Sequence, residues 1–183
     1  MKVRTAPEEY EIQKNDICVF LAGGITGCPN WQKKVLERIK SFENSPAKDA
    51  FDHLIIFNPR RDHFDALKDD ANEQIEWEFK YLNRIDIFSM YFCKDTIQPI
   101  CLYELGRYIE VMKRRFPGDY RKRVLISVDP KYERAVDVVI QANLALEYDE
   151  NPEDMNLWLY TSSYEHHADS IVTAYLELNL LKE

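Results

Sequence analysis

Glu104 stands out in the sequence because it lies where an extended, proline-marked segment turns into a helical pattern, in the stretch IQPICLYELGRYIEVM. The partial positive charge at a helix N-terminus favours an ionised carboxylate in the first turn. An ionised carboxylate that is held in place can act as a nucleophile. Acidic residues are also common in first turns simply because they stabilise the helix. On spacing alone, Glu104 is therefore either a nucleophile or a partner of the helix dipole.

Two further carboxylates stand next to apolar patterns. Glu78 lies between Trp77 and Phe79 on a helix-period segment, and Asp86 stands within the strand-like run that follows it. An unpartnered carboxylate in a buried strand would be costly. Glu78 and Asp86 therefore join Glu104 as candidate site residues.

Short apolar runs alternate with helix-period segments along the chain. The runs at 17–22, 53–58, 85–92 and 123–128 are rich in β-branched and aromatic residues, which favours strands. Helical spacing fills 31–42, 71–84 and 102–115, and it recurs in YERAVDVVIQANLALEY and between 162 and 181. This alternation predicts an α/β, three-layer, flavodoxin-like fold, with a central parallel sheet of about five strands and helices on both faces.

The length of 183 residues suits a single domain, 1–183. We expect its core at about 17–147. The segment YDENPEDMN, residues 148–156, has the composition of a loop and would separate an appended C-terminal element at about 157–183.

Charge and hydropathy exclude several classes of partner. A formal net charge of -8 would repel the phosphate backbone of a nucleic-acid polymer. The longest apolar runs are too short for a membrane span, and the first residues lack the apolar core of a signal peptide, so a cytoplasmic location is expected. The four cysteines have no CxxC spacing and read as buried thiols. The neighbours His166 and His167 point to different faces, so no metal site is expected.

The loops that follow the strands are where a ligand should bind, because ligands of open parallel sheets lie outside the carboxyl ends of the strands. The first loop, AGGITGCPN, offers Gly23, Gly24 and Ile25, whose backbone can approach an oxygen-rich sugar or a phosphate. It has neither the GxGxxG order nor a P-loop lysine, and a plain tight turn is the alternative. The second loop, NPRRDHFD, offers Asn58 and Arg60, although for this stretch by itself a solvated ion-pair cluster is the favoured interpretation.

Taken together, these segments resemble the nucleoside 2-deoxyribosyltransferase superfamily, which also contains deoxynucleoside 5'-monophosphate N-glycosidases. The similarity rests on VFLAGGITG, on NPRR, on the spacing of eight residues from Glu78 to Asp86, and on the YELG that carries Glu104. It covers about residues 17 to 128. The order and spacing of the four segments carry the match, and YELG after a strand and turn is its most specific part.

The resemblance implies a function and a mechanism. Glu104 would attack the anomeric carbon of a 2'-deoxyribonucleoside, and an incoming base would capture the covalent deoxyribosyl-enzyme with net retention. Glu78 would contact the base and move its proton, because a purine or pyrimidine leaves poorly unless it is protonated. No cofactor is implied. The partners would be a small-molecule deoxynucleoside and a free base, and a homo-oligomer is expected.

Three positions depart from the family pattern. Phe20 stands where tyrosine is usual, Glu78 where aspartate is usual, and Gln98 where transferases often carry an aspartate that binds the 5'-hydroxyl. Gln98 is neutral and therefore neither repels a 5'-phosphate nor supplies a charged anchor. Base exchange on 2'-deoxyribonucleosides is the leading hypothesis. The alternatives are hydrolysis of deoxynucleoside 5'-monophosphates and a non-catalytic nucleotide-binding module on the same scaffold.

Overall fold

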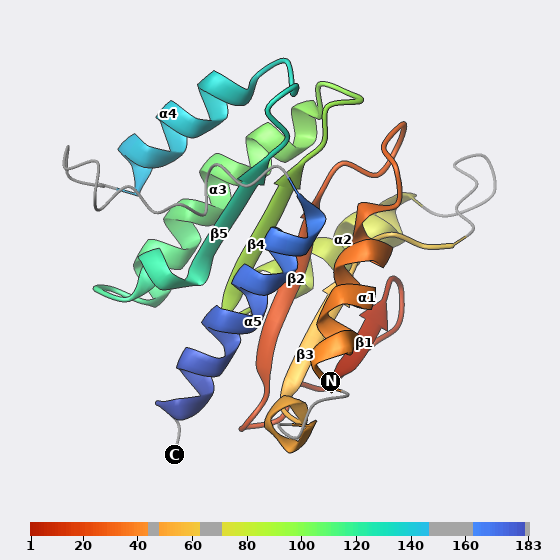
Figure 1. Cartoon of the computed structure of the whole chain (residues 1–183), viewed down its shortest axis with the longest axis vertical. Helices are drawn as coiled ribbons and strands as arrows, with labels where there is room; N and C mark the ends of the chain where they lie inside the picture. Colours follow the sequence, from red (N-terminus) through yellow and green to blue (C-terminus); the bar gives the residue numbers. More distant parts are fainter. Residues whose placement is uncertain (44–47, 63–70, 147–162, 182–183) are drawn as a thin grey trace.

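The computed structural model describes residues 1–43, 48–62, 71–146 and 163–181 (Figure 1). Its strands are β1 (Lys2–Thr5), β2 (Ile17–Gly23), β3 (Leu54–Asn58), β4 (Ile87–Phe92) and β5 (Val124–Val128). Its α-helices are α1 (Trp31–Glu43), α2 (Ala71–Leu82), α3 (Pro99–Arg115), α4 (Ala135–Ala145) and α5 (Tyr164–Leu180). Two short 3-10 helices, η1 (Lys48–Phe51) and η2 (Tyr120–Arg123), complete the described elements.

The sheet is parallel throughout, with the strand order β1-β3-β2-β4-β5. Counted from β2, the inner order is the 2-1-3-4 of a flavodoxin-like sheet, and β1 adds an edge strand beside β3. The four runs predicted as strands are β2 to β5, so the predicted fold class is confirmed. The sequence did not identify β1, because KVRT is short, polar and only partly buried.

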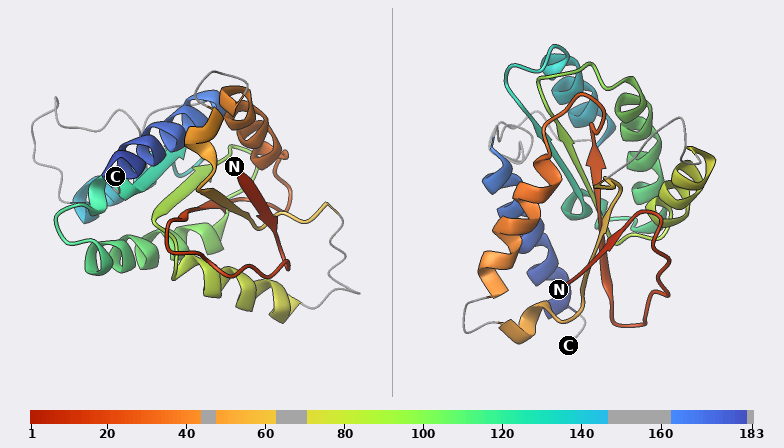
Figure 2. Two further views of the ribbon diagram at one scale, coloured as in Figure 1. Left: turned by 90° about the horizontal axis from the view of Figure 1, so that it is seen from below. Right: turned by 90° about the vertical axis from the view of Figure 1, so that its right-hand side faces the viewer.

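Successive side chains of each strand point to opposite faces of the sheet, and each face forms its own core cluster. Cys18 and Phe20 of β2 point to the face that α2, α3 and α4 cover. Val19 and Leu21 point to the opposite face, which α1 and α5 cover (Figure 2). Strands buried on both faces read as continuous apolar runs, which is the pattern expected of a parallel sheet between two helical layers.

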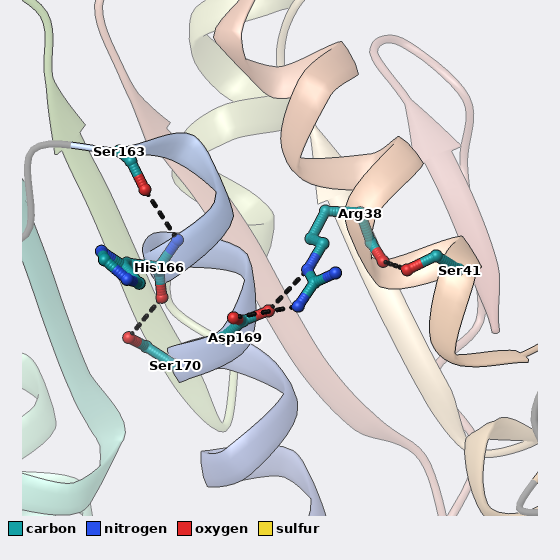
Figure 3. A network of polar contacts seen from close by, with 6 residues as sticks. All are labelled: Arg38, Ser41, Ser163, His166, Asp169 and Ser170. Carbon is teal, nitrogen blue, oxygen red and sulfur yellow. Dashed lines mark hydrogen bonds and ion pairs between the residues drawn. The ribbon is translucent and has the colours of Figure 1, made fainter.

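Helix α5 belongs to one of these layers. Arg38 of α1 donates from Nε and Nη2 to the two carboxylate oxygens of Asp169, at 2.8 and 3.2 Å (Figure 3). At the start of the helix, the Ser163 hydroxyl accepts a hydrogen bond from the backbone N–H of His166, at 3.2 Å. The sequence set this segment apart as an appended element, whereas in the structure α5 supplies apolar side chains such as Ile171 to the second core cluster.

His167 joins α5 to the sheet. Its two ring nitrogens each lie 2.8 Å from a serine hydroxyl, that of Ser89 on β4 and that of Ser127 on β5. Complete burial lowers the pKa of His167 to about 3, so the ring is neutral. A neutral imidazole has one donor and one acceptor nitrogen, and a hydroxyl can match either. The site therefore satisfies a buried histidine without a metal ligand set, and among the described residues no group of three or more His, Cys, Asp or Glu is placed to hold a metal.

The start of α3 lies three residues earlier than the sequence predicted. The helix begins at Pro99 instead of residue 102, because proline is well tolerated in the first turn, where its missing N–H would have no helical partner. Gln98 before it adopts a left-handed conformation, with φ 51° and ψ 56°. The loop predicted at 148–156 lies outside the described residues. No helix in the described ranges is both long and apolar enough to cross a membrane.

Candidate active site

A pocket of about 340 Å³ opens at the carboxyl end of β2, on the side of the sheet that α2 and α3 cover. Phe20 and residues 23–26 form one wall, and residues 96–101 at the start of α3 form the other. Glu78 of α2 and Glu104 of α3 both line it. The structure therefore brings together most of the predicted site residues, from loops and helices that are far apart in the sequence.

The two carboxyl groups of the pocket influence each other's ionisation. Burial, followed by the charge of Glu78, raises the pKa of Glu104 to about 7, and Arg107 opposes the change. Burial also raises the pKa of Glu78, against a hydrogen bond from Gln74 and the charge of Arg61. Two neighbouring carboxylates ionise together only at a cost. Burial and this coupling therefore favour a state in which the pair holds one proton, which is the state that an acid and a nucleophile acting together require.

The expected effect of the helix dipole on Glu104 is wrong. With α3 beginning at Pro99, Glu104 falls in the second turn, and the influence of the dipole fades within the first. The side chain is half-buried, and no hydrogen-bond donor among the described residues contacts its carboxylate. Desolvation therefore outweighs the dipole, and the pKa of Glu104 rises instead of falling.

Glu78 has a hydrogen-bonded partner that the sequence analysis missed. Gln74 donates from Nε2 to Glu78 Oε1 at 2.6 Å, and its own Oε1 accepts from Arg61 Nε at 2.7 Å. The spacing of four residues on α2 is the signal that would have found Gln74, because side chains at i and i+4 meet on one helix face.

Gln98 braces the glycine loop. Its side-chain oxygen accepts a hydrogen bond from the Gly24 N–H at 2.9 Å, and its nitrogen donates to the carbonyls of Cys93 and Thr96 at 2.6 and 3.0 Å. The side chain lines the pocket but is only 6% exposed. Both ends of the amide are thus engaged by the backbone, and Gln98 holds the wall of the pocket in shape.

Arg60 holds the same loop from outside the pocket. Its guanidinium donates to the carbonyl oxygens of Ile25, at 2.9 Å, and of Gly24 and Cys28, at 3.2 Å. Partial burial lowers the pKa of Arg60. Arg60 is not among the residues that line the pocket. The NPRR segment therefore contributes Arg60, whose guanidinium stabilises the conformation of the glycine loop by binding its backbone carbonyls.

Gly24 has to be glycine because the side chains of Cys28 and Gln98 occupy the space that a Cβ would take. A Cβ there would lie 2.4 Å from Cys28 Sγ and 2.6 Å from Gln98 Oε1. The Gly24 carbonyl accepts a hydrogen bond from the indole N–H of Trp31 at 2.9 Å. The glycine loop is thus a packed structure and more than a tight turn.

Besides Arg60, two other predicted site residues do not line the pocket. Asp86 directly precedes β4 and therefore lies at the amino end of the strand, away from the pocket. Its carboxylate accepts a hydrogen bond from the Cys18 N–H at 2.8 Å, and its own N–H donates to the Cys18 carbonyl at 2.8 Å. These bonds explain an acidic residue beside apolar strands. Asn58 accepts from the Arg60 N–H at 3.1 Å, which shapes the turn after β3 and leaves Pro59 on the pocket wall.

The prediction of four thiols is wrong for two of the cysteines. Cys28 in the glycine loop and Cys93 after β4 form a disulfide, whereas Cys18 and Cys101 are free and buried. The bonded pair is separated by 65 positions in the sequence and gave no spacing signal. The loop after β2 folds back toward the end of β4, because those two strands are neighbours in the sheet.

Comparison with known proteins agrees with this geometry. The family model described as nucleoside 2-deoxyribosyltransferase like matches residues 16–116, more than half of the chain. The matched segment includes β2, β4 and the whole of α2 and α3, and therefore both pocket carboxylates. No curated protein sequence gave a significant match. With its flavodoxin-like sheet, its paired carboxylates and this match, the chain belongs to the nucleoside 2-deoxyribosyltransferase-like family.

Proposed function

We propose that the protein exchanges the base of 2'-deoxyribonucleosides, with Glu104 as the nucleophile and Glu78 as the acid and base. Family membership gives the general kind of function, the processing of nucleosides. The observation that carries the finer proposal is that Glu78 and Glu104 line one pocket, where burial raises the pKa of both carboxyl groups.

The proposed reaction has two displacements. Glu104 attacks C1' of the deoxyribose, the C1'–N bond breaks with its electron pair moving to the base, and Glu78 protonates that base. A second base then gives a proton to Glu78 and attacks C1', which releases Glu104. Each step inverts C1', so the product retains the configuration of the donor, as in retaining glycosidases.

The lining of the pocket favours donors without a phosphate. No lysine or arginine is among the described residues that line it, while two carboxyl groups are. A 5'-phosphate would then rely on the N-terminus of α3 alone, and the Gly24 N–H nearby is already donated to Gln98. A neutral 5'-hydroxyl has no such requirement. We therefore place deoxynucleosides before deoxynucleoside 5'-monophosphates as substrates.

A homo-oligomer is part of the proposal. Five large apolar side chains near the pocket are at least half exposed: Ile75, Phe79, Ile97, Ile100 and Tyr103. Phe79 on α2 lies 4.7 Å beneath the Arg107 guanidinium of α3, so the patch crosses both helices. Exposed apolar surface of this kind favours association. Light scattering should show that Ile100→Glu reduces the oligomer, while Val136→Glu on the exposed face of α4 serves as the control.

The decisive experiment offers deoxyinosine or thymidine together with free adenine and follows the products by chromatography. We expect deoxyadenosine from the wild type and none from Glu104→Ala. Free deoxyribose from deoxynucleoside 5'-monophosphates would indicate an N-glycosidase instead. Binding without turnover in both proteins would indicate a nucleotide-binding module.

A further inference from the structure

A chain of hydrogen bonds leads from Arg61 through Gln74 to the pocket. Arg61 donates from Nε to Gln74 Oε1 at 2.7 Å. The Gln74 amide nitrogen lies 2.8 Å from the Pro59 carbonyl and 2.6 Å from Glu78 Oε1. Arg61 also contacts Glu73 at 2.9 Å, on the outer side of the helix. Every polar atom of the Gln74 side chain thus has a partner, and of these partners Pro59 and Glu78 line the pocket, Glu78 being the one with an ionisable side chain.

The partners fix which way the Gln74 amide faces. A guanidinium is only a donor and a peptide carbonyl is only an acceptor. The amide oxygen must therefore face Arg61, and the amide nitrogen must face Pro59. The reversed amide would set a donor against a donor and an acceptor against an acceptor. One N–H of Gln74 is bound to Pro59, so the other is donated to Glu78.

We propose that Gln74 is a positioning residue which directs the acid proton of Glu78 to Oε2, by donating a hydrogen bond to Oε1. When Glu78 is protonated, the oxygen that accepts this bond at 2.6 Å is the carbonyl oxygen of its carboxyl group. The proton is left on the other oxygen, Oε2. This inference rests on the proposed function and assigns the atom through which Glu78 acts.

The arrangement serves both halves of the exchange. When the first base leaves, its nitrogen takes the proton from Oε2, and the ionised Glu78 is stabilised by the Gln74 N–H, in agreement with the lowering effect of this bond on its pKa. When the second base arrives, it returns a proton to Oε2. Oε1 stays an acceptor throughout, so Gln74 does not have to rotate during the cycle.

Other ionisable groups near Glu78 do not supply this hydrogen bond. Glu104 and Cys101 share the pocket, and both feel the charge of Glu78, as does Tyr108 of α3. Arg61 lowers the pKa of Glu78 through its charge and contacts it through Gln74. Gln74 is therefore the group to change.

The test uses two substitutions and a matched control. In Gln74→Glu, Arg61 keeps the new carboxylate ionised, so Glu78 must donate from Oε1, and its proton moves away from Oε2. Gln74→Met removes the donor without adding charge. The control, Glu73→Gln, removes the ion pair between Arg61 and Glu73 and leaves the bond between Gln74 and Glu78 in place. Circular dichroism and thermal unfolding check that each variant is folded.

Two nucleoside substrates distinguish a loss of proton transfer from a general loss of catalytic activity. The base of deoxyguanosine needs a proton to leave, whereas 7-methyl-2'-deoxyguanosine releases a neutral base without one. With adenine as the acceptor, we expect Gln74→Glu to lower kcat/KM at least about 10-fold for deoxyguanosine and less than about 3-fold for the methylated donor, since acid catalysis contributes roughly 100- to 10,000-fold. Glu73→Gln should change neither donor. Equal losses for the two donors, or no loss at all, would overturn the proposal.

A second measurement does not depend on turnover. Carbon-13 NMR of the Glu78 carboxyl group follows its titration in the wild type and in Gln74→Met. We expect the midpoint to rise in the variant, because the ionised form loses a donor. An unchanged midpoint would show that Gln74 does not bond Glu78 in solution, and would overturn the proposal even if base exchange is active. If the wild type shows no base exchange but the midpoint shifts in Gln74→Met, the proposed function is wrong, while the hydrogen bond from Gln74 to Glu78 is confirmed.

Discussion

Replacing Glu104 by glutamine should stabilise the folded protein at alkaline pH while it abolishes base exchange. Burial and the charge of Glu78 raise the pKa of Glu104 from 4.5 to about 7. The folded state therefore binds a proton more tightly than the unfolded state does, and it loses stability as the pH rises from 4.5 to 7. Above pH 7 the buried carboxylate of the folded protein is ionised, which lowers the free energy of unfolding. A neutral glutamine at this position avoids that loss.

The size of the effect follows from the displacement of the pKa. A difference of about 2.5 pH units corresponds to about 3 kcal/mol at pH 8, and to less than about 1 kcal/mol at pH 5, where the folded wild type keeps the proton. For a chain of this length, 1 kcal/mol moves Tm by roughly 2 to 4 °C. Glu104→Gln should therefore raise Tm by roughly 6 to 12 °C at pH 8, with a much smaller rise at pH 5.

The assay is thermal or urea unfolding of three proteins at pH 5 and pH 8. Glu76→Gln is the matched control, because Glu76 is an exposed residue of α2 and its replacement removes the same charge. This control should change stability by less than about 0.5 kcal/mol at either pH. If Glu104→Gln is no more stable than the control at pH 8, then Glu104 is well solvated, and the electrostatic account of the site is wrong.

Three further predictions concern the pocket and its loop. With the methylated donor, kcat/KM should rise with pH through a midpoint near 7, as Glu104 ionises. A stopped assay of Glu78→Gln should give a lower midpoint, because the charge that raises the pKa of Glu104 is gone. An unchanged midpoint would show that Glu78 does not influence the ionisation of Glu104. Gly24→Ala should destabilise the fold by roughly 1 to 3 kcal/mol by overpacking, whereas Gly106→Ala, with no atom within 4 Å of the new Cβ, should not, and urea unfolding of both measures the contrast. Inosine should have a lower kcat/KM than deoxyinosine with one acceptor, because the 2'-hydroxyl withdraws electrons from a developing positive charge at C1'; equal values would rule out selection for deoxyribose.

The sheet and the pocket wall were predictable from the sequence because their signals are local. Strands such as Ile17–Gly23 are buried on both faces and therefore appear as continuous apolar runs. The rule that ligands bind at the carboxyl ends of parallel strands then pointed to the loop after β2 and to the start of α3. Glu78 and Glu104 were found in this way, together with the resemblance of their segments to a known family.

The electrostatics of the site could not be predicted, because they depend on distances between segments that are far apart in the chain. The pKa of Glu104 rises through burial and through Glu78, which lies on a different helix. The neutral Gln98 gave no sign that its amide would hold the Gly24 N–H, since 74 residues separate them. The disulfide and the edge strand β1 were missed for the same reason, because each depends on a partner that only the fold brings near.

The bracing of Gly24 also sets when the site forms during folding. Its N–H is held by Gln98 and its carbonyl by Trp31 and Arg60, so the loop takes its final shape only after β3 and the start of α3 have docked. Contacts between distant segments form late, because closing long loops costs chain entropy. In native-state hydrogen exchange, the amide proton of Gly24 should therefore exchange only when α3 separates from β2. The protection of this single amide proton would report whether the pocket is assembled, independently of any substrate.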